Sequence, residues 1–180
     1  VELPNDKVYS PENIIEIHQR SSDSCGIAFT YNEPTVNFEF VLDTAMLASQ
    51  NHIPVILVTN GYISSMALDM LLPYITALNI DLKAFSDDFY RKYTGGGILP
   101  VLETIKKAYE AQKHVEITFL AIHELNDRLV EFNLMVEWIL HNLESSVPFH
   151  VSKYFPNYKL INDPTPDEIL VKLYELASAK

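Results

Sequence analysis

Apolar runs typical of β-strands alternate with helical patterns along the whole chain. The predicted strands are 26–30, 54–59, 78–82, 115–122 and 149–154, and the predicted helices are 11–21, 37–51, 64–72, 99–112, 127–143 and 167–177. Strands that are each followed by a helix lie parallel and are buried by the helices. The pattern therefore predicts an α/β fold in a single domain over residues 1–180, either a doubly wound sheet or part of a barrel.

Polar residues recur where the predicted strands end. They occupy positions 30–33, 59–60, 81–83 and 150–153. In a βα barrel the carboxyl ends of the strands form the rim on which a functional site is assembled, with different strands each giving a residue. This distribution favours a partial TIM-type barrel over a doubly wound sheet.

Charge and hydropathy exclude several kinds of partner. The formal net charge is −11 and the pI is about 4.8, so the surface repels nucleic acid and anionic membranes. No apolar run approaches the roughly 20 residues that span a bilayer, and the first ten residues lack the basic and apolar parts of a signal peptide. We expect a cytoplasmic protein that binds neither nucleic acid nor membrane.

Cysteine and histidine content argues against a metal site built by this chain. Cys25 is the single cysteine, so an internal disulfide and a cluster held by several thiolates of this chain are excluded. None of the six histidines forms an H-x-x-x-H or H-E-x-x-H pattern. We predict no metal ligands here, and we expect Cys25 to be a small buried residue.

Two strand ends carry charged residues that could bind a ligand. Alternation places Asn79, Asp81 and Lys83 on one face of their strand, where an Asp–Lys ion pair and a ligand site are equally good interpretations. Glu33 leaves a strand and enters a helix, so it could accept hydrogen bonds from an ammonium group or simply start the helix. Both interpretations stay open for each residue.

Two further rim positions have strong structural alternatives. Asn60 lies in a Thr-Asn-Gly sequence that is typical of a tight turn. His150 shares a strand face with Ser152 and Tyr154 and could line the same cavity, although a lone strand histidine is more often a hydrogen-bonded structural residue. Neither residue defines a site without its neighbours.

The order of these segments resembles a known family. The segments are GIAFTYNEPTVNFEFVLDTAMLA, ILVTNGYIS, LNIDLKAFSDDFYRKYTGG, VEITFLAIHELND, VPFHVSKYFPNYKL and DPTPDE. Together they resemble the AmmeMemoRadiSam branch of the pyruvate formate-lyase activating enzyme-like radical S-adenosylmethionine (SAM) proteins, from about residue 10 to residue 177. The resemblance implies a partial (β/α)6 barrel that lacks its first strand here, because that strand would precede Val1.

The resemblance also implies roles for residues on the rim. Glu33 would accept hydrogen bonds from the methionine amino group of SAM, with Tyr31 and Asn32 beside it. Asn60 and Asp81 would contact the ribose or the methionyl end of SAM. Lys83 and His150 would line the same pocket. The sequence departs from the family at Val58, where the activating enzymes have Asp, and at Glu116, where they have Arg. These departures predict a remodelled rim.

The family's [4Fe–4S] cluster is held by C-x-x-x-C-x-x-C, a motif that this sequence does not contain. The resemblance implies a parent enzyme that uses an electron donor to cleave SAM reductively, giving a 5′-deoxyadenosyl radical that activates a glycyl-radical enzyme or another substrate. This chain alone would bind SAM weakly without turnover, because one cysteine cannot ligate the cluster.

Two other functions remain open at this stage. Lys83 could act as a Schiff-base nucleophile with Asp81 as its proton partner. Alternatively, the chain could be a cluster-less interaction protein that uses the groove for a partner. If a first strand is missing, the 26–29 strand has an open edge, which favours an edge-paired dimer and a loosely ordered segment over residues 1–10.

Overall fold

The five strands of this protein form one parallel sheet in the order β1-β2-β3-β4-β5. The computed structural model describes residues 8–180, so most of the 1–10 segment for which loose order is predicted lies outside the described residues. The strands are β1 (Ile27–Phe29), β2 (Val55–Thr59), β3 (Ala77–Asp81), β4 (His114–Ala121) and β5 (Phe149–Lys153). All five predicted strands are confirmed, with shifts of no more than one residue at their ends.

Helices connect the strands in the predicted order. The α-helices are α1 (Pro11–Arg20), α2 (Phe38–Gln50), α3 (Ser65–Leu71), α4 (Asp87–Phe89), α5 (Leu99–Glu110), α6 (Leu129–Asn142) and α7 (Asp167–Ser178), and the shorter turns are η1 (Pro34–Asn37), η2 (Leu72–Tyr74) and η3 (Tyr90–Thr94). Ser10 caps α1, since its hydroxyl accepts from the N–H of Asn13. The sequence interpretation missed α4 and η3.

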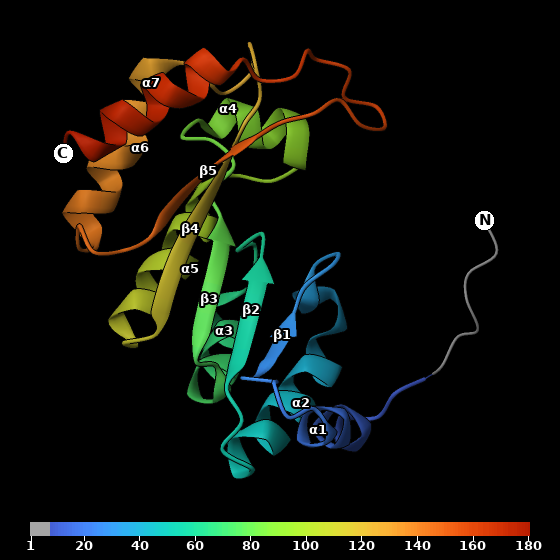
Figure 1. The fold of residues 1–180 in the computed structure, drawn as a ribbon. Coiled ribbons are helices and arrows are strands. Elements are labelled where there is room, and N and C mark those ends of the chain that lie inside the picture. Colours follow the sequence, from blue (N-terminus) through green and yellow to red (C-terminus); the bar gives the residue numbers. More distant parts are fainter. Residues whose placement is uncertain (1–7) are drawn as a thin grey trace.

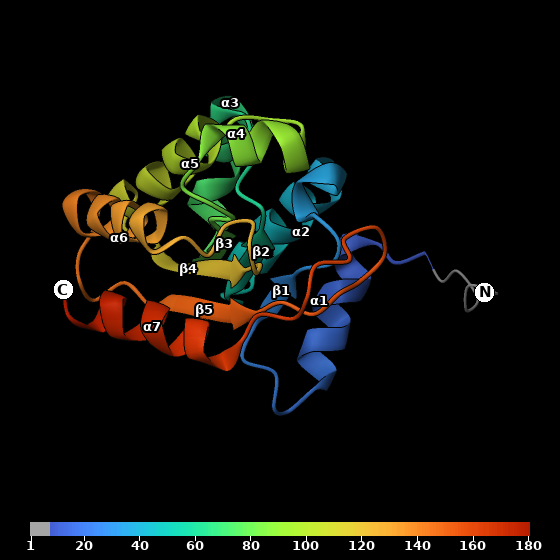
Figure 2. The same cartoon turned by 90° about the horizontal axis from the view of Figure 1, so that it is seen from above.

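The sheet is curved and its helices lie on the outside of the curve. Figure 2 shows the five strands following an arc, with α2, α3, α5, α6 and α7 around it. Figure 1 shows the loops that follow the strands gathered at one end of the sheet. This arrangement confirms the partial-barrel prediction and excludes the doubly wound alternative, which needs helices on both faces of the sheet.

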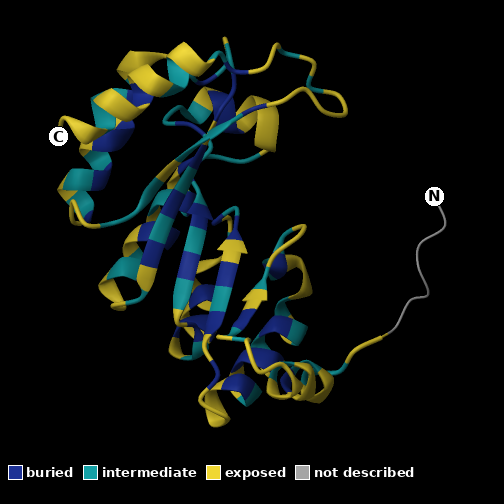
Figure 3. Cartoon of the chain, viewed as in Figure 1, coloured by how far each residue is buried: buried dark blue, intermediate teal, exposed yellow. Residues whose placement is uncertain are grey.

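The two faces of the sheet differ in burial. Leu57, Ile80 and Phe119 point outward to the helices and are fully or almost fully buried, and the alternation of buried and less buried residues along the strands is visible in Figure 3. Inward-facing neighbours such as Val58 and Leu120 stay more than a third exposed. The inner face is therefore open to a ligand.

The open edge predicted for the first strand is present. Within the described residues β1 pairs only with β2, in the register Ile27–Val55 to Phe29–Leu57. No helix within residues 8–180 has both the length and the apolar character needed to cross a bilayer.

Candidate functional site at the carboxyl ends of the strands

A pocket of about 460 Å³ lies at the carboxyl ends of β1, β2 and β3. Its lining residues are Thr30, Tyr31, Asn32, Glu33, Val58, Thr59, Asn60, Asp81 and Lys83. Six of the seven rim residues singled out from the sequence thus share one cavity. Parallel strands bring them together because all their carboxyl ends lie on one edge of the sheet.

Glu33 is the centre of the hydrogen bonding in this pocket. It caps η1, where its Oε1 accepts from the N–H and the hydroxyl of Thr35 at 3.2 and 2.9 Å. The same oxygen accepts from the hydroxyl of Thr59 at 2.7 Å, and Oε2 accepts from the N–H of Asn60 at 2.7 Å. Glu33 therefore starts the helical turn and also fastens the end of β1 to the end of β2.

Asn60 makes the turn that leaves β2. Its Oδ1 accepts from the N–H of Tyr62 at 2.7 Å, which is an Asx-type turn. Gly61 has a φ of +71°, and a Cβ there would lie 2.7 Å from Cγ2 of Ile80. The turn thus needs glycine for both conformation and space, and the predicted Thr-Asn-Gly turn is confirmed.

Lys83 and Asp81 form an ion pair at the end of β3. The Lys83 Nζ lies 2.7 Å from Oδ2 of Asp81, and both side chains are more than a third exposed. The Lys83 N–H donates to the hydroxyl of Tyr90, and Asn126 Nδ2 donates to the Lys83 carbonyl at 2.7 Å. Both backbone groups of Lys83 are thereby fixed, while its ammonium and the Asp81 carboxylate remain within reach of a ligand.

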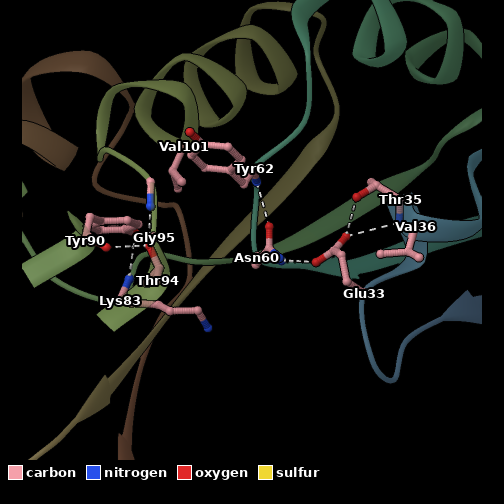
Figure 4. Close-up of a pocket in the computed structure, with 11 residues that line it drawn as sticks. Glu33, Thr35, Val36, Asn60, Tyr62, Lys83, Tyr90, Thr94, Gly95 and Val101 are labelled. Atoms are coloured by element: carbon pink, nitrogen blue, oxygen red, sulfur yellow. Dashed lines mark hydrogen bonds between the residues drawn. The ribbon is translucent and has the colours of Figure 1, made fainter. Parts of the chain in front are cut away.

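A second, smaller pocket shares part of this lining. It measures about 300 Å³ and contains Glu33, Asn60 and Lys83, which also line the larger pocket. Figure 4 shows these three side chains together, with Tyr62 and Val101 on another wall. The two pockets form neighbouring parts of one rim site.

His150 lies on the same sheet face but outside this site. His150 pairs in register with Thr118 of β4, and Thr118 pairs in register with Asp81 of β3. Neither rim pocket of the described structure includes His150. Its Nε2 is 2.8 Å from Oε2 of Glu116. His150 is thus a hydrogen-bonded strand histidine, and neither rim pocket places it in the same cavity as Glu33.

Glu116 gathers several inner-face groups that the sequence did not connect. Its Oε1 is 3.0 Å from Nε2 of His114, and its Oε2 accepts from Asn79 Nδ2 at 3.2 Å. Hydrogen bonds from His114 and then from His150 lower the pKa of the Glu116 carboxyl below its ordinary value of 4.5. The available signal was the period-two run His114, Glu116, Thr118, which puts three polar residues on one strand face.

Tyr90 and Asn126 are supporting residues that sequence reasoning missed. Burial raises the pKa of the Tyr90 phenol to about 12, so it stays protonated as the acceptor for Lys83. Asn126 is 3% exposed and joins Lys83 to the end of β4, where its Nδ2 also donates to the Leu120 carbonyl. Neither had a local signal, because Asn126 acts on Lys83 across 43 positions and Tyr90 lies in the short α4–η3 segment, which displays no helical period.

The iron–sulfur cluster of the resembled family does not fit the cysteine content of this chain. Cys25 is exposed and immediately precedes Gly26 and β1, at the end of the sheet opposite the rim. The expectation that it is buried was wrong, because the turn that leads into β1 leaves its side chain on the surface. Among residues 8–180 no three histidine, cysteine or carboxylate side chains are grouped to hold a metal ion.

Comparison with known proteins identifies the family of this chain. The family model described as the radical SAM superfamily matches residues 2–139. An uncharacterised protein of Methanocaldococcus jannaschii is 37% identical over 169 residues, which are 93% of this chain and 50% of that protein. The chain therefore spans about half the length of this relative.

Solved structures show the same fold at low sequence identity. A domain of pyruvate-formate lyase-activating enzyme from Bacteroides vulgatus is 20% identical with a TM-score of 0.67, covering 86% of this chain and 93% of that one. SuiB of Streptococcus suis bound to SAM is 14% identical with a TM-score of 0.75, covering 98% and 42%. With the family-model match over most of its length, the chain belongs to the radical SAM superfamily.

Proposed function

We propose that this chain forms the SAM-binding rim of a radical SAM enzyme of the activating-enzyme type. The supporting observation is the 460 Å³ pocket, whose lining includes the carboxylates of Glu33 and Asp81 and the ammonium of Lys83. SAM carries an ammonium, a carboxylate and two ribose hydroxyls. Each of these groups has a complementary partner in the pocket.

The proposed contacts follow from the free hydrogen-bonding capacity. Oε1 of Glu33 accepts three hydrogen bonds, whereas Oε2 accepts one and keeps a lone pair for the methionyl ammonium. Lys83 would attract the methionyl carboxylate, and Asp81 would accept from the ribose. Tyr31, Asn32 and Asn60 complete the walls, and His150 is a more distant candidate on β5.

In this family, SAM bound at a reduced iron–sulfur cluster supplies a 5′-deoxyadenosyl radical. The cysteine content of this chain does not provide the ligands for such a cluster, so its own residues bind and orient the cofactor. The electron donor, and a glycyl-radical enzyme or other substrate, belong to the proposal for the whole protein. We expect the 180 residues alone to bind SAM without cleaving it.

A calorimetric titration with SAM tests this proposal. We expect weak binding, with a dissociation constant on the order of 0.1–1 mM, and about tenfold weakening by Glu33→Gln, since a charge-assisted hydrogen bond contributes about 1.5–3 kcal/mol. Glu39→Gln, at an exposed position of α2, is the matched control and should bind like the wild type. Urea unfolding of each variant separates lost binding from lost folding.

Two outcomes would contradict the proposal. Absence of SAM binding would show that the rim is not a SAM site. Equal SAM binding by the Glu33 and Glu39 variants would show that Glu33 does not contact SAM. Submicromolar binding would instead show that the cluster is not the main anchor.

A second candidate, Lys83 as a Schiff-base nucleophile, has the neighbouring Asp81 at 2.7 Å in its favour. Borohydride trapping with pyruvate, followed by mass spectrometry, separates it from SAM binding. A stable adduct on Lys83 that is lost in Lys83→Arg would favour the Schiff base.

A further inference from the structure

Another pocket, of about 420 Å³, also has Lys83 in its lining. It is lined by Lys83, Phe89, Tyr93, Thr94, Ile122, Lys159 and Leu160. These residues come from the segments that follow β3, β4 and β5, including α4 and η3. Figure 1 shows the segment after β5 above the carboxyl ends of the strands. The residues that line the proposed SAM pocket lie at these ends of β1, β2 and β3.

The walls of this pocket are mainly apolar. The rings of Phe89 and Tyr93 lie 4.8 Å apart at 40°, which gives a continuous aromatic surface. Phe89 and Ile122 are each 8% exposed, so their positions are set by packing in the protein. A ligand that fits here needs an apolar body, since such sites bind by burying apolar surface.

Both charged groups in the lining are lysines, although the chain as a whole carries a net charge of −11. Lys83 is paired with Asp81. Within residues 8–180, Lys159 has no carboxylate at ion-pair distance, and its Nζ lies 5.2 Å from the centroid of the Tyr158 ring. Lys159 is therefore available to an anionic group of a ligand.

The turn that carries Lys159 is held in place by the fold. Asn157 and Leu160 exchange two backbone hydrogen bonds of 3.2 Å, and the Tyr154 hydroxyl donates to the Leu160 carbonyl at 2.6 Å. Thr165, which is fully buried, fastens the following segment by donating to the Ala121 carbonyl. These hydrogen bonds fix the backbone that carries Lys159, which lines the pocket.

We propose that this pocket binds the substrate, a small organic acid with an aromatic or aliphatic body and one anionic group. The body packs against Phe89, Tyr93 and Ile122, and the anion pairs with Lys159. This inference rests on the proposed SAM function. Lys83 lines both pockets, so a substrate in this pocket would lie next to SAM in the other.

The experiment is an amide NMR titration of the full chain with 3-phenylpropionate as the probe. We expect shifts at Phe89, Tyr93, Ile122 and Leu160 with a dissociation constant in the millimolar range. The neutral amide of the probe should bind about three- to tenfold more weakly, because it lacks the charge-assisted contact.

Lys159→Glu should weaken binding of the acid and leave binding of the amide unchanged. Lys106→Glu makes the same change of net charge at an exposed position of α5 and serves as the matched control. Equal binding of acid and amide, an unaffected Lys159→Glu variant, or shifts confined to other parts of the chain would each overturn the inference.

A parallel titration with SAM keeps the two proposals separate. SAM should shift Thr30, Val58 and Asn60 in the other pocket. If the acid binds as expected and SAM does not, the SAM function fails while the acid site stands. If SAM binds and the acid does not, the acid site fails alone.

Discussion

The outer and inner faces of the sheet use the same strands for different purposes. Outward residues such as Ile117 and Phe119 are fully buried under the helices, whereas Glu116 and Leu120 beside them on β4 face the open interior. A parallel sheet covered on both faces has nearly continuous apolar strands. The alternation in this protein instead marks a sheet whose inner face is not covered by helices, so we expect the buried outer face to supply most of the stability.

The largest expected effect comes from a cavity on the outer face. Phe119→Ala removes a fully buried ring that packs against the ring of Phe132, with 5.3 Å between the two ring centroids. We expect it to lower the free energy of unfolding by about 3–5 kcal/mol. The inward neighbour Leu120, 39% exposed, is the matched control, and Leu120→Ala should cost less than about 1 kcal/mol. Urea unfolding measures both, and similar losses would disprove the division of roles between the faces.

A smaller effect is expected from the polar network that supports the rim. Asn126→Ala leaves the carbonyls of Lys83 and Leu120 and the N–H of Ile122 without their partner. Each buried group left unpaired costs about 1–3 kcal/mol when water cannot reach it, so we expect a total loss of about 2–4 kcal/mol and weaker SAM binding.

Asn133→Ala, a change on the surface of α6, serves as the control for Asn126 and should stay within about 0.5 kcal/mol of the wild type. Unfolding curves and calorimetry on the same samples give both quantities. An Asn126 variant with normal stability and normal SAM binding would remove its assigned role.

The smallest effect concerns the pH dependence of the inner face. The pKa of Glu116 is lowered in the folded state, so its contribution to stability is complete above the unfolded value near 4.5 and is lost as the pH falls through the lower folded value. The difference in unfolding free energy between the wild type and Glu116→Gln should therefore shrink as the pH falls below about 4.5. A difference that grows on acidification would reverse the assignment.

The sequence predicted most of the elements because their signals are local. Apolar runs gave the strands, and helical patterns between them gave α1, α2, α3, α5, α6 and α7. The segment from Asp87 to Thr94 was missed because α4 spans three residues and η3 is a π-helical turn, both too short to display a helical period.

Burial at surface turns was also outside the reach of local rules. Cys25 was expected inside on the general preference of cysteine for buried positions, and the turn before β1 leaves it exposed. Residue type is a weak guide where the chain reverses direction at the surface.

By itself, the sequence determined the βα order and the residues placed at the carboxyl ends of the strands, since these follow from periodicity along the chain, and the polar residues at those ends favoured the partial barrel over a doubly wound sheet. The tertiary structure decided which of those residues meet. Glu33 contacts Thr59 and Asn60 across more than 25 positions, and His150 contacts Glu116 across 34. Contacts of this kind depend on strand register and sheet curvature, which arise only when all five strands pack together.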